Sequence, residues 1–466
     1  MPDLQNDGDP RANAERWIPG EFVVAQRDVP LVRALLRDEL NLHLVDREPE
    51  ATRWPAYGET PVPDGDVELS ESLGLALFRL HDPDAVLAAL RLHRRVRDTA
   101  LADPTVTAVT AVLGLIELIC RDRYHGWAPQ MARNQGGHGV HATPYVSIGA
   151  DEGYPAMAME TLREELEPAD TVHEPRRQPR TVNVGILDTA MLPRPEFEGR
   201  WLGIGPDPVL AVTPGKPLPH VSGHATFIAG LVLQLAPRAL LHVAQVLDPR
   251  DGSASVWDVA KAMMRLSTSV DVLNLSFCCF TDDGQPPLAL RHALERMDPT
   301  TVVIAAAGNH GKLPCGAPPG RISGASTMWP AAFDRVIAVG SHNREGSRSP
   351  FSPDVPWVRV TALGEGLTST YLHGDVEITY VDGDTGPPSL TFTEPAYARW
   401  SGTSFASAVV AALVANLTGH GPWGAYEALH RVLAQAAAPT TLAGLPLVLL
   451  PKPDPDHEHV SAGGED

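Results

Sequence analysis

The chain has 466 residues, of which 43% are hydrophobic and 20% are charged. This composition excludes an intrinsically disordered chain, and the length is enough for about three domains. The 57 acidic residues outnumber the 37 Lys and Arg residues and give a formal net charge of −20. We therefore expect neither nucleic acid nor an anionic membrane surface as a partner, because both are bound by clustered basic side chains.

Signals for export and for disulfide or zinc chemistry are missing from the sequence. The N-terminal residues lack the basic and apolar segments of a secretory signal, and the apolar stretches at 108–120 and 406–417 are shorter than a membrane span. We expect a cytoplasmic protein, with secretion by another route left open. The chain has four cysteines and no CxxC pair, so neither a disulfide framework nor a zinc site is predicted.

A polar N-terminus, residues 1–20, is expected to be disordered, and strand-like and helix-like segments alternate after it. These segments are strands at 21–25 and 73–78, helices at 29–40 and 82–96, and a β-rich stretch at 106–118. The second helix has a clear start, because Asp82 is a good N-cap and Pro83 suits the first helical position. The pattern predicts a small α+β domain over residues 21–125.

Residues 126–180 are predicted to be a linker, because they are rich in Gly, Pro and polar side chains. The Arg-rich stretch 174–180 is a candidate processing site or, equally, an uncleaved linker. His138 and His141 have a spacing seen among metal ligands, but no second cluster supports a metal site there.

From residue 181 the pattern changes to strands that alternate with helices. Strands are predicted at 182–187, 241–247, 270–277, 301–306 and 335–340, and helices at 255–266, at 288–296 and from His224. This alternation predicts an α/β fold with a parallel, doubly wound sheet, whose active site lies at the carboxyl ends of the strands. Residues 449–466 are rich in Pro and acidic side chains and are expected to be a disordered tail.

Four polar residues stand where such a site is expected. Asp188 follows the strand 182–187, and Asn309 follows a strand that ends in Ala307-Gly308. His224 begins a helix within a block of small residues, and Ser404 lies at the positive N-terminal end of another helix. Taken singly, each has an ordinary structural explanation as a turn residue, a core histidine or an N-cap.

Taken together, in the order Asp, His, Asn, Ser, these blocks resemble the subtilisin-like serine peptidases, or subtilases. The resemblance covers about residues 181–448. It rests on Asp188-Thr189, Gly223-His224-Ala225-Thr226, Asn274-Leu275-Ser276, Ala307-Gly308-Asn309, Trp329-Pro330-Ala331 and Gly402-Thr403-Ser404. It implies a sheet of subtilisin type in a peptidase domain at 181–448, with a β-hairpin insertion near 364–397, after the small α+β N-terminal domain.

The resemblance implies a serine endopeptidase that works through an acyl-enzyme. Ser404 would be the nucleophile, His224 the general base and Asp188 the group that orients the imidazole. Asn309 and the backbone N–H of Ser404 would form the oxyanion hole. A peptide or protein substrate would lie along two segments, which are Ser276, Phe277 and Cys278, and Ala306, Ala307 and Gly308.

No cofactor is required for this chemistry. Calcium binding by Asp382 and Asp384 in the hairpin turn is the alternative to a solvated turn, and the sequence does not favour it. Cys278 and Cys279 stand where the family usually has glycines, and Ala190, Phe227 and Ala408 are further departures. These departures affect the groove and leave the four chemical groups in place. Cys278 is more simply a buried apolar residue than a redox-sensitive site.

Two other functions stay open at this point. One is a non-catalytic subtilase-like binding or scaffold protein, and the other is an intracellular peptidase dedicated to one partner substrate. The N-terminal domain is expected either to bind the catalytic domain, as the pro-domains of the family do, or to bind a partner.

Overall fold

The computed structural model describes residues 17–47, 64–97, 99–103, 105–139, 180–315, 322–358, 360–378, 389–436 and 448–449. The chain divides into two compact units. The first unit contains the chain up to Gly137 together with residues 254–265 and 283–297, and the second contains the remainder. The first unit therefore includes two segments, carrying α6 (Val256–Leu266) and α7 (Leu288–Arg296), that lie within the predicted peptidase domain in sequence.

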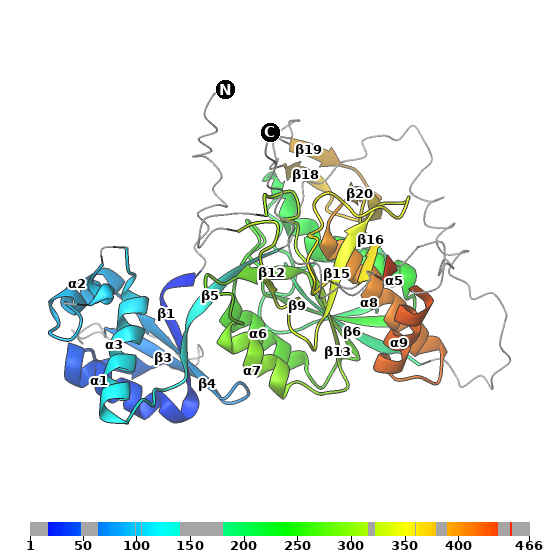
Figure 1. Ribbon diagram of the computed structural model, residues 1–466. Coiled ribbons are helices and arrows are strands. Elements are labelled where there is room, and N and C mark those ends of the chain that lie inside the picture. The colour runs from blue at the N-terminus through cyan, green and yellow to red at the C-terminus, as the bar shows by residue number, and fades with distance from the viewer. Residues whose placement is uncertain are drawn as a thin grey trace, which may run out of the picture. The chain divides into compact units, whose positions relative to one another are not determined.

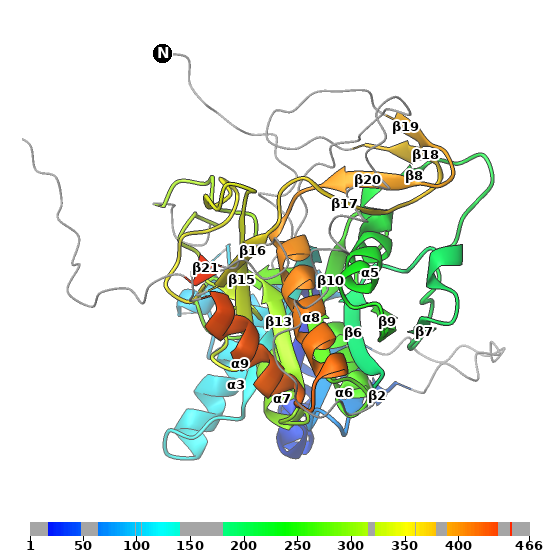
Figure 2. The same cartoon turned by 90° about the vertical axis from the view of Figure 1, so that its right-hand side faces the viewer.

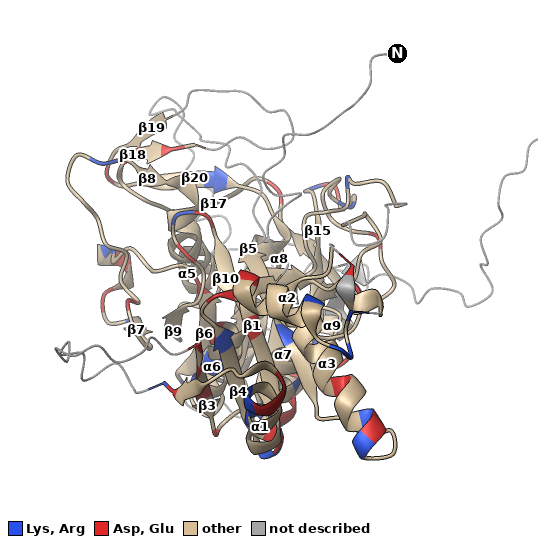
Figure 3. Ribbon diagram, turned by 90° about the vertical axis from the view of Figure 1, so that its left-hand side faces the viewer, with Lys and Arg blue, Asp and Glu red and all other residues tan. Residues whose placement is uncertain are grey.

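The first unit is built on a sheet with the strand order β5-β1-β4-β3-β2 (Figure 1). Its strands are β1 (Trp17–Ala25), β2 (Leu44–Asp46), β3 (Gly65–Ser70), β4 (Leu75–Leu80) and β5 (Met131–Gly139). Its N-terminal helices are α1 (Val29–Leu40), α2 (Pro83–Leu92) and α3 (Ala108–Arg123). One face of the sheet shares an apolar core with these helices, and the stacked rings of Phe22 and Phe78, 5.0 Å apart, lie within it. Acidic and basic positions are interspersed along α1 and α3 (Figure 3).

The opposite face of this sheet carries a network of charges. Arg79 on β4 donates hydrogen bonds to Glu21 (3.0 Å), Asp66 (3.1 Å) and Glu68 (2.6 Å). Glu68 also accepts hydrogen bonds from the Trp257 indole (3.1 Å) and the Lys261 ammonium (2.6 Å) of α6. This network connects α6 to the sheet within the first unit.

Two sequence expectations for this region are wrong. Residues 106–118 are not β-rich, because α3 begins at Ala108, where the Thr107 hydroxyl accepts a hydrogen bond from the Thr110 N–H. The buried residues of α3 recur at helical spacing, so packing of that face outweighs the preference of valine for strands. The linker predicted from residue 126 contains β5, whose residues pair with β1.

The second unit contains a sheet in the order β21-β16-β15-β13-β11-β6-β9-β7. Its strands are β6 (Val182–Asp188), β7 (Trp201–Gly203), β9 (Ala239–Gln245), β11 (Val272–Leu275), β13 (Val302–Ala306), β15 (Ile337–His342), β16 (Val360–Leu363) and β21 (Val448–Leu449). All pairs are parallel except that of β16 with β21. The predicted parallel α/β fold is confirmed.

Helix α8 (Thr403–His420) lies along this sheet beside β13, next to α5 (His224–Leu235) and α9 (Ala425–Ala436) (Figure 2). In the described part of the chain it is the one helix with the length and apolar composition of a membrane span. Of its residues, 83% are buried in the core of the unit, which explains that composition.

The predicted hairpin insertion packs against the start of α5. Strand β18 (Gly374–Glu377) pairs antiparallel with β19 (Ser389–Phe392), and β17 (Leu367–Thr370) pairs with β20 (Tyr397–Trp400). The Tyr371 hydroxyl donates a hydrogen bond to the His220 carbonyl (2.7 Å), and Ser369 donates to the Phe227 carbonyl (2.7 Å). The turn with Asp382 and Asp384 lies outside the described residues.

Candidate active site

Asp188 and His224 form a buried pair at the carboxyl end of β6. Asp188 is the last residue of β6, His224 is the first residue of α5, and both are 0% exposed. The imidazole Nδ1 lies 2.8 Å from both carboxylate oxygens, and the N–H of Thr189 donates to the same carboxylate (2.7 Å). A carboxylate only accepts hydrogen bonds, so Nδ1 carries a proton and Nε2 is left as the basic nitrogen of the neutral ring.

The segment that follows Asp188 is attached to α5 by hydroxyl groups. The Thr189 hydroxyl accepts a hydrogen bond from the Ala225 N–H (3.1 Å), and the Thr226 hydroxyl accepts one from the Leu192 N–H (2.9 Å). These bonds hold the strand end and the helix start in register, so the carboxylate and the imidazole meet without a flexible connection.

Aromatic rings surround the imidazole. The ring centroid of Trp400 lies 5.5 Å from that of His224 at an interplanar angle of 86°, and that of Phe405 lies 5.4 Å away at 45°. Phe227, which stands where the family usually has His, packs on both rings at 5.6 and 4.6 Å. All three aromatic side chains are at most 1% exposed, so the Asp188–His224 pair lies in a medium of low polarity.

Ser404 lies in the first turn of α8 and is buried. Its hydroxyl donates a long hydrogen bond to the Ser276 carbonyl (3.4 Å). Its own carbonyl accepts hydrogen bonds from the Ser276 hydroxyl (3.3 Å) and the Ser407 hydroxyl (2.8 Å). The amide of Asn274 donates to the Ser276 hydroxyl (2.8 Å) and completes this network. The start of α8 is thereby held against the end of β11.

The amide of Asn309 is oriented through its oxygen. The Asn309 Oδ1 accepts hydrogen bonds from the N–H and the hydroxyl of Thr403, both at 3.1 Å, and the Thr403 hydroxyl accepts one from the Gly308 N–H (3.1 Å). The Nδ2 group is buried and has no hydrogen-bond partner among the described residues. A buried donor without a partner is costly, so its retention here points to a ligand that accepts from it.

The two segments predicted to bind substrate lie on either side of the end of the sheet. Ser276 follows β11, and Phe277 and Cys278 belong to β12 (Phe277–Phe280), in which the Phe277 ring is buried. Ala306 ends β13, Ala307 donates to the Val339 carbonyl (3.0 Å), and Gly308 has φ of 106°.

One of these segments is already paired with an extended chain. Within the second unit, His138 and Gly139 at the end of β5 pair antiparallel with Cys278 and Phe277. The backbone edge of β12 at Phe277 and Cys278 is therefore occupied by residues distant in the sequence. His138 lies in this pairing, whereas His141, the other histidine considered for a metal site that the sequence does not favour, lies outside the described residues.

Neither cysteine of β12 has the character of a reactive thiol. Burial raises the pKa of Cys278 to about 12, and burial also raises the pKa of Cys279. Nucleophilic and redox-active cysteines need an accessible thiolate, so the interpretation of Cys278 as a small apolar residue is favoured over a redox-sensitive site. In the described parts of the chain, no three His, Cys, Asp or Glu side chains gather in a way that would hold a metal ion.

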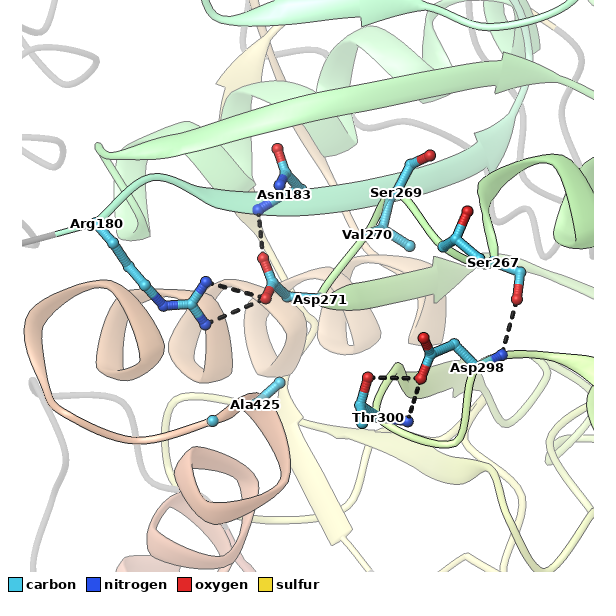
Figure 4. A pocket seen from close by; sticks show the side chains of 11 residues that line it. Arg180, Asn183, Ser267, Ser269, Val270, Asp271, Asp298, Thr300 and Ala425 are labelled. Atoms are coloured by element: carbon cyan, nitrogen blue, oxygen red, sulfur yellow. Dashed lines mark hydrogen bonds and ion pairs between the residues drawn. The ribbon is translucent and has the colours of Figure 1, made fainter.

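A polar cavity of about 250 Å³ lies elsewhere in the second unit, at the amino ends of β6, β11 and β13. Figure 4 shows that its carboxylates are engaged by neighbours. Asp271 accepts hydrogen bonds from Arg180 (3.1 Å) and from the Asn183 N–H (2.9 Å), and Asp298 accepts from Thr300 (2.6 and 2.8 Å). None of the four candidate residues lines this cavity.

Sequence reasoning assigned no role to several residues that hold the site together. Thr403 orients Asn309, Asn274 and Ser407 support the Ser404 turn, and Trp400 packs on His224. Thr403 and Asn274 belong to the motifs that carry the resemblance, but their roles, like that of Trp400, depend on contacts made in the tertiary fold.

A family model, curated proteins and solved structures resemble this chain. The family model described as the subtilase family matches residues 180–456. The chain is 31% identical over 210 residues to "Thermophilic serine proteinase" of Bacillus sp. (strain AK1), covering 43% of this chain and 42% of the relative. It is 32% identical over 212 residues to "Mycosin-4" of Mycobacterium tuberculosis (strain ATCC 25618 / H37Rv), covering 42% and 44%. The chain thus spans less than half the length of either relative.

Among solved structures, fervidolysin from Fervidobacterium pennivorans, described as a keratinolytic enzyme related to subtilisin, matches with a TM-score of 0.53. That match covers 87% of this chain and 55% of fervidolysin at 16% identity, so it concerns the fold alone. The family match extends over more than half of the sequence and includes Asp188, His224, Asn309 and Ser404. The chain belongs to the subtilase family.

Proposed function

We propose that this chain is a serine endopeptidase that hydrolyses peptide bonds through an acyl-enzyme. The observation that carries the proposal is the combination of a buried Asp188–His224 pair at 2.8 Å with a buried Asn309 amide whose Nδ2 lacks a partner among the described residues. The first supplies a base with one defined basic nitrogen, and the second supplies a donor for an oxyanion. Membership of the subtilase family supports both assignments.

In the first half of the reaction, the Ser404 oxygen forms a bond to the substrate carbonyl carbon while its proton passes to Nε2 of His224. The negative charge that develops on the carbonyl oxygen is stabilised by the Asn309 amide and by the backbone N–H of Ser404 at the positive end of α8. His224 then gives the proton to the leaving amine. A water molecule repeats the sequence and releases the acyl group.

The surroundings of His224 suit this proton transfer. The imidazolium is positively charged, and Asp188 at 2.8 Å stabilises it by direct attraction. The faces of aromatic rings also attract cations within about 6 Å, and the centroids of Trp400 and Phe405 lie 5.5 and 5.4 Å away. The low polarity of the site strengthens both effects.

Substrate is proposed to bind as an added strand along β12 and Ala306–Gly308. The antiparallel pairing of β12 with His138 and Gly139 supports this mode, because a substrate backbone would form hydrogen bonds of the same kind. The same pairing supports an inhibitory role for the N-terminal region over its alternative as a module for other partners. Because the pairing occupies the proposed substrate position, we expect a peptidase that acts on few substrates. The cytoplasmic location remains a prediction.

The test is covalent labelling of the full-length chain with a fluorophosphonate, read by intact mass. Wild type is expected to gain one phosphonyl group, and Ser404→Ala is expected to gain none. Folded wild type that stays unmodified contradicts the proposal and favours a non-catalytic scaffold. An N-terminal cut seen in wild type and absent in Ser404→Ala would identify self-processing, and limited digestion of casein would indicate a dedicated peptidase.

A further inference from the structure

The hairpin insertion is joined by backbone pairing to the segment that leads into His224. Strand β18 pairs antiparallel with β19 on one edge and parallel with β8 (Leu218–Pro219) on the other, so the three strands form one small sheet (Figure 2). A single 3-10 turn, His220–Gly223, follows β8, and α5 begins directly after it. The insertion is therefore connected to the turn that brings His224 to Asp188.

One buried side chain of the insertion contacts both ends of this turn. The Tyr371 hydroxyl donates a hydrogen bond to the carbonyl of His220, the first residue of the turn, at 2.7 Å. The Tyr371 ring lies against Gly223, the last residue, because a Cβ built on Gly223 would lie 2.4 Å from Cε2 of the ring. Gly223 has a φ of −84°, which any residue adopts, so the ring and not the backbone requires glycine here. A shift of the turn would therefore break the hydrogen bond or bring Gly223 into the ring.

The contact continues along α5. The Ser369 hydroxyl of β17 donates to the Phe227 carbonyl at 2.7 Å. It also lies so near Gly230 that a Cβ built on this glycine would be 2.2 Å from the Ser369 Oγ. Gly230 follows Phe227 by about one helical turn, so β17 lies along one face of the helix. The start of α5 and the turn before it are thus held by one continuous stretch, residues 369–371.

The insertion also contacts the segment that follows Asp188. The Arg194 side chain is buried, and its guanidinium forms an ion pair with Glu394, which lies between β19 and β20. The same guanidinium lies 3.1 Å from Nδ1 of His373. The hydrogen bonds from Arg194 lower the pKa of Glu394, so this carboxylate is ionised near pH 7. The segments on both sides of the Asp188–His224 pair are therefore attached to the same insertion.

We propose that Tyr371 is a positioning residue for the imidazole of His224. By fixing the turn before the helix, it keeps the ring on Asp188 and presents Nε2 to Ser404. This inference rests on the proposed peptidase function. Catalysis by a positioned base depends steeply on distance and direction, and a misplacement of about 1 Å can cost roughly a hundredfold in rate. Tyr371 acts through the backbone of the turn, so loss of its hydroxyl should lower kcat and leave substrate binding almost unchanged.

The first experiment compares two substitutions of the same kind at different places in the second unit. Tyr371→Phe removes the bond to His220, and Tyr426→Phe removes a bond of 3.3 Å from the Tyr426 hydroxyl to the Thr301 carbonyl, at the amino end of β13. In the full-length chain, Tyr371→Phe is expected to lower kcat roughly three- to tenfold with KM within about twofold of wild type. Tyr426→Phe is expected to keep the wild-type kcat. Wild-type kcat in Tyr371→Phe, or equal losses in the two variants, would overturn the role of Tyr371.

A second measurement reports on the Asp188–His224 pair without substrate. An imidazole N–H that is hydrogen-bonded to a carboxylate gives a proton resonance far downfield in NMR, and its loss in His224→Ala identifies it in the full-length chain. Tyr371→Phe is expected to shift or broaden this resonance, and Tyr426→Phe to leave it in place. If the resonance is the same in wild type and Tyr371→Phe, the positioning role is overturned, even where kcat falls. If folded wild type is not labelled by the fluorophosphonate, the peptidase proposal fails, and the resonance still decides whether Tyr371 places the imidazole.

Discussion

Two carboxylates, one in each unit, are held in opposite ways. Asp188 in the second unit is 0% exposed and meets a single titratable partner, the imidazole of His224, with aromatic rings around the pair. Glu68 in the first unit is half-buried and accepts hydrogen bonds from Arg79, Lys261 and Trp257. A carboxylate paired with one imidazole can orient that ring for proton transfer. A carboxylate paired with two cations is held in its charged form and has a structural role.

The first unit also shows that one arginine does not fix the state of every carboxylate around it. Burial raises the pKa of Glu68, but hydrogen bonds from Lys261, Arg79 and Trp257 together outweigh that effect and hold the pKa at about 2. Burial also raises the pKa of Glu21, and there the bonds from Asn134 and Arg79 do not compensate. The number of donors decides, rather than the presence of Arg79.

The largest expected effect concerns the Nδ2 group of Asn309, which has no hydrogen-bond partner among the described residues. Asn309→Ala removes the Nδ2 group and is expected to lower kcat by roughly 10²–10³, a figure taken from a subtilisin, which belongs to the same family, with KM almost unchanged. Steady-state kinetics on one peptide measures both parameters. Asn183→Ala is the matched control, because Asn183 lies at the end of β6 away from Asp188, and it should leave kcat as in wild type. Equal losses in the two variants would contradict an oxyanion role.

A smaller effect is expected from the rings around His224. Trp400→Leu removes an aromatic ring whose centroid lies 5.5 Å from that of the imidazole and should lower kcat by about tenfold, because a desolvated cation beside an aromatic ring gains roughly 1–2 kcal/mol. Trp400→Phe keeps an aromatic ring and should recover most of the rate. The measurement is the separation of kcat from KM in the three proteins. Recovery of the rate by an aliphatic but not an aromatic residue would contradict ring-to-cation stabilisation.

The smallest effects distinguish the two carboxylates on Arg79 by their dependence on pH. The folded-state pKa of Glu68 is depressed, so its contribution to stability is present above its ordinary pKa near 4.5 and is lost as the pH falls toward 2. Glu68→Gln should therefore cost about 1–2 kcal/mol at pH 7 and less than half as much at pH 3. Urea unfolding of the full-length chain at both pH values measures this difference.

Glu21→Gln is the matched control for that experiment. The folded-state pKa of Glu21 is raised, so its ionisation opposes folding near neutral pH, and replacing it should be neutral or stabilising at pH 7. Equal destabilisation by the two substitutions at pH 7 would contradict this account. It would show that loss of the hydrogen bonds to Arg79, and not the pKa shift of each carboxyl, determines the effect on stability.

The sequence predicts best the parts in which local pattern and tertiary role coincide. The strand before Asp188, the helix from His224 and the strand before Asn309 are apolar runs bounded by small or polar residues, and all three form as expected. The order of Asp188, His224, Asn309 and Ser404 along the chain also carries the resemblance to the family, because each lies in a short motif that can be read from the sequence alone.

The parts that the sequence does not predict depend on contacts between distant segments. Residues 108–123 are rich in residues that favour strands, and a buried helical face decides otherwise. Strand β5 has a Gly-rich, polar sequence typical of a linker and is defined by its pairing with β1. The orientation of the Asn309 amide is set by Thr403, 94 positions away.

Under the substrate-binding mode proposed above, the pairing of His138 and Gly139 with β12 means that a substrate competes with a strand of the same chain. Because the occupant belongs to the same chain, its effective concentration is set by the tether, on the order of millimolar for a short flexible one, and does not change when the protein is diluted. To displace that strand, a substrate of equal affinity would have to exceed this effective concentration, and a weaker one would need a proportionally higher concentration. Cleavage of the chain next to the strand would remove this requirement. Under the proposed function, dilution alone would leave the chain inactive, whereas a single cleavage would make the release of activity depend on protein concentration.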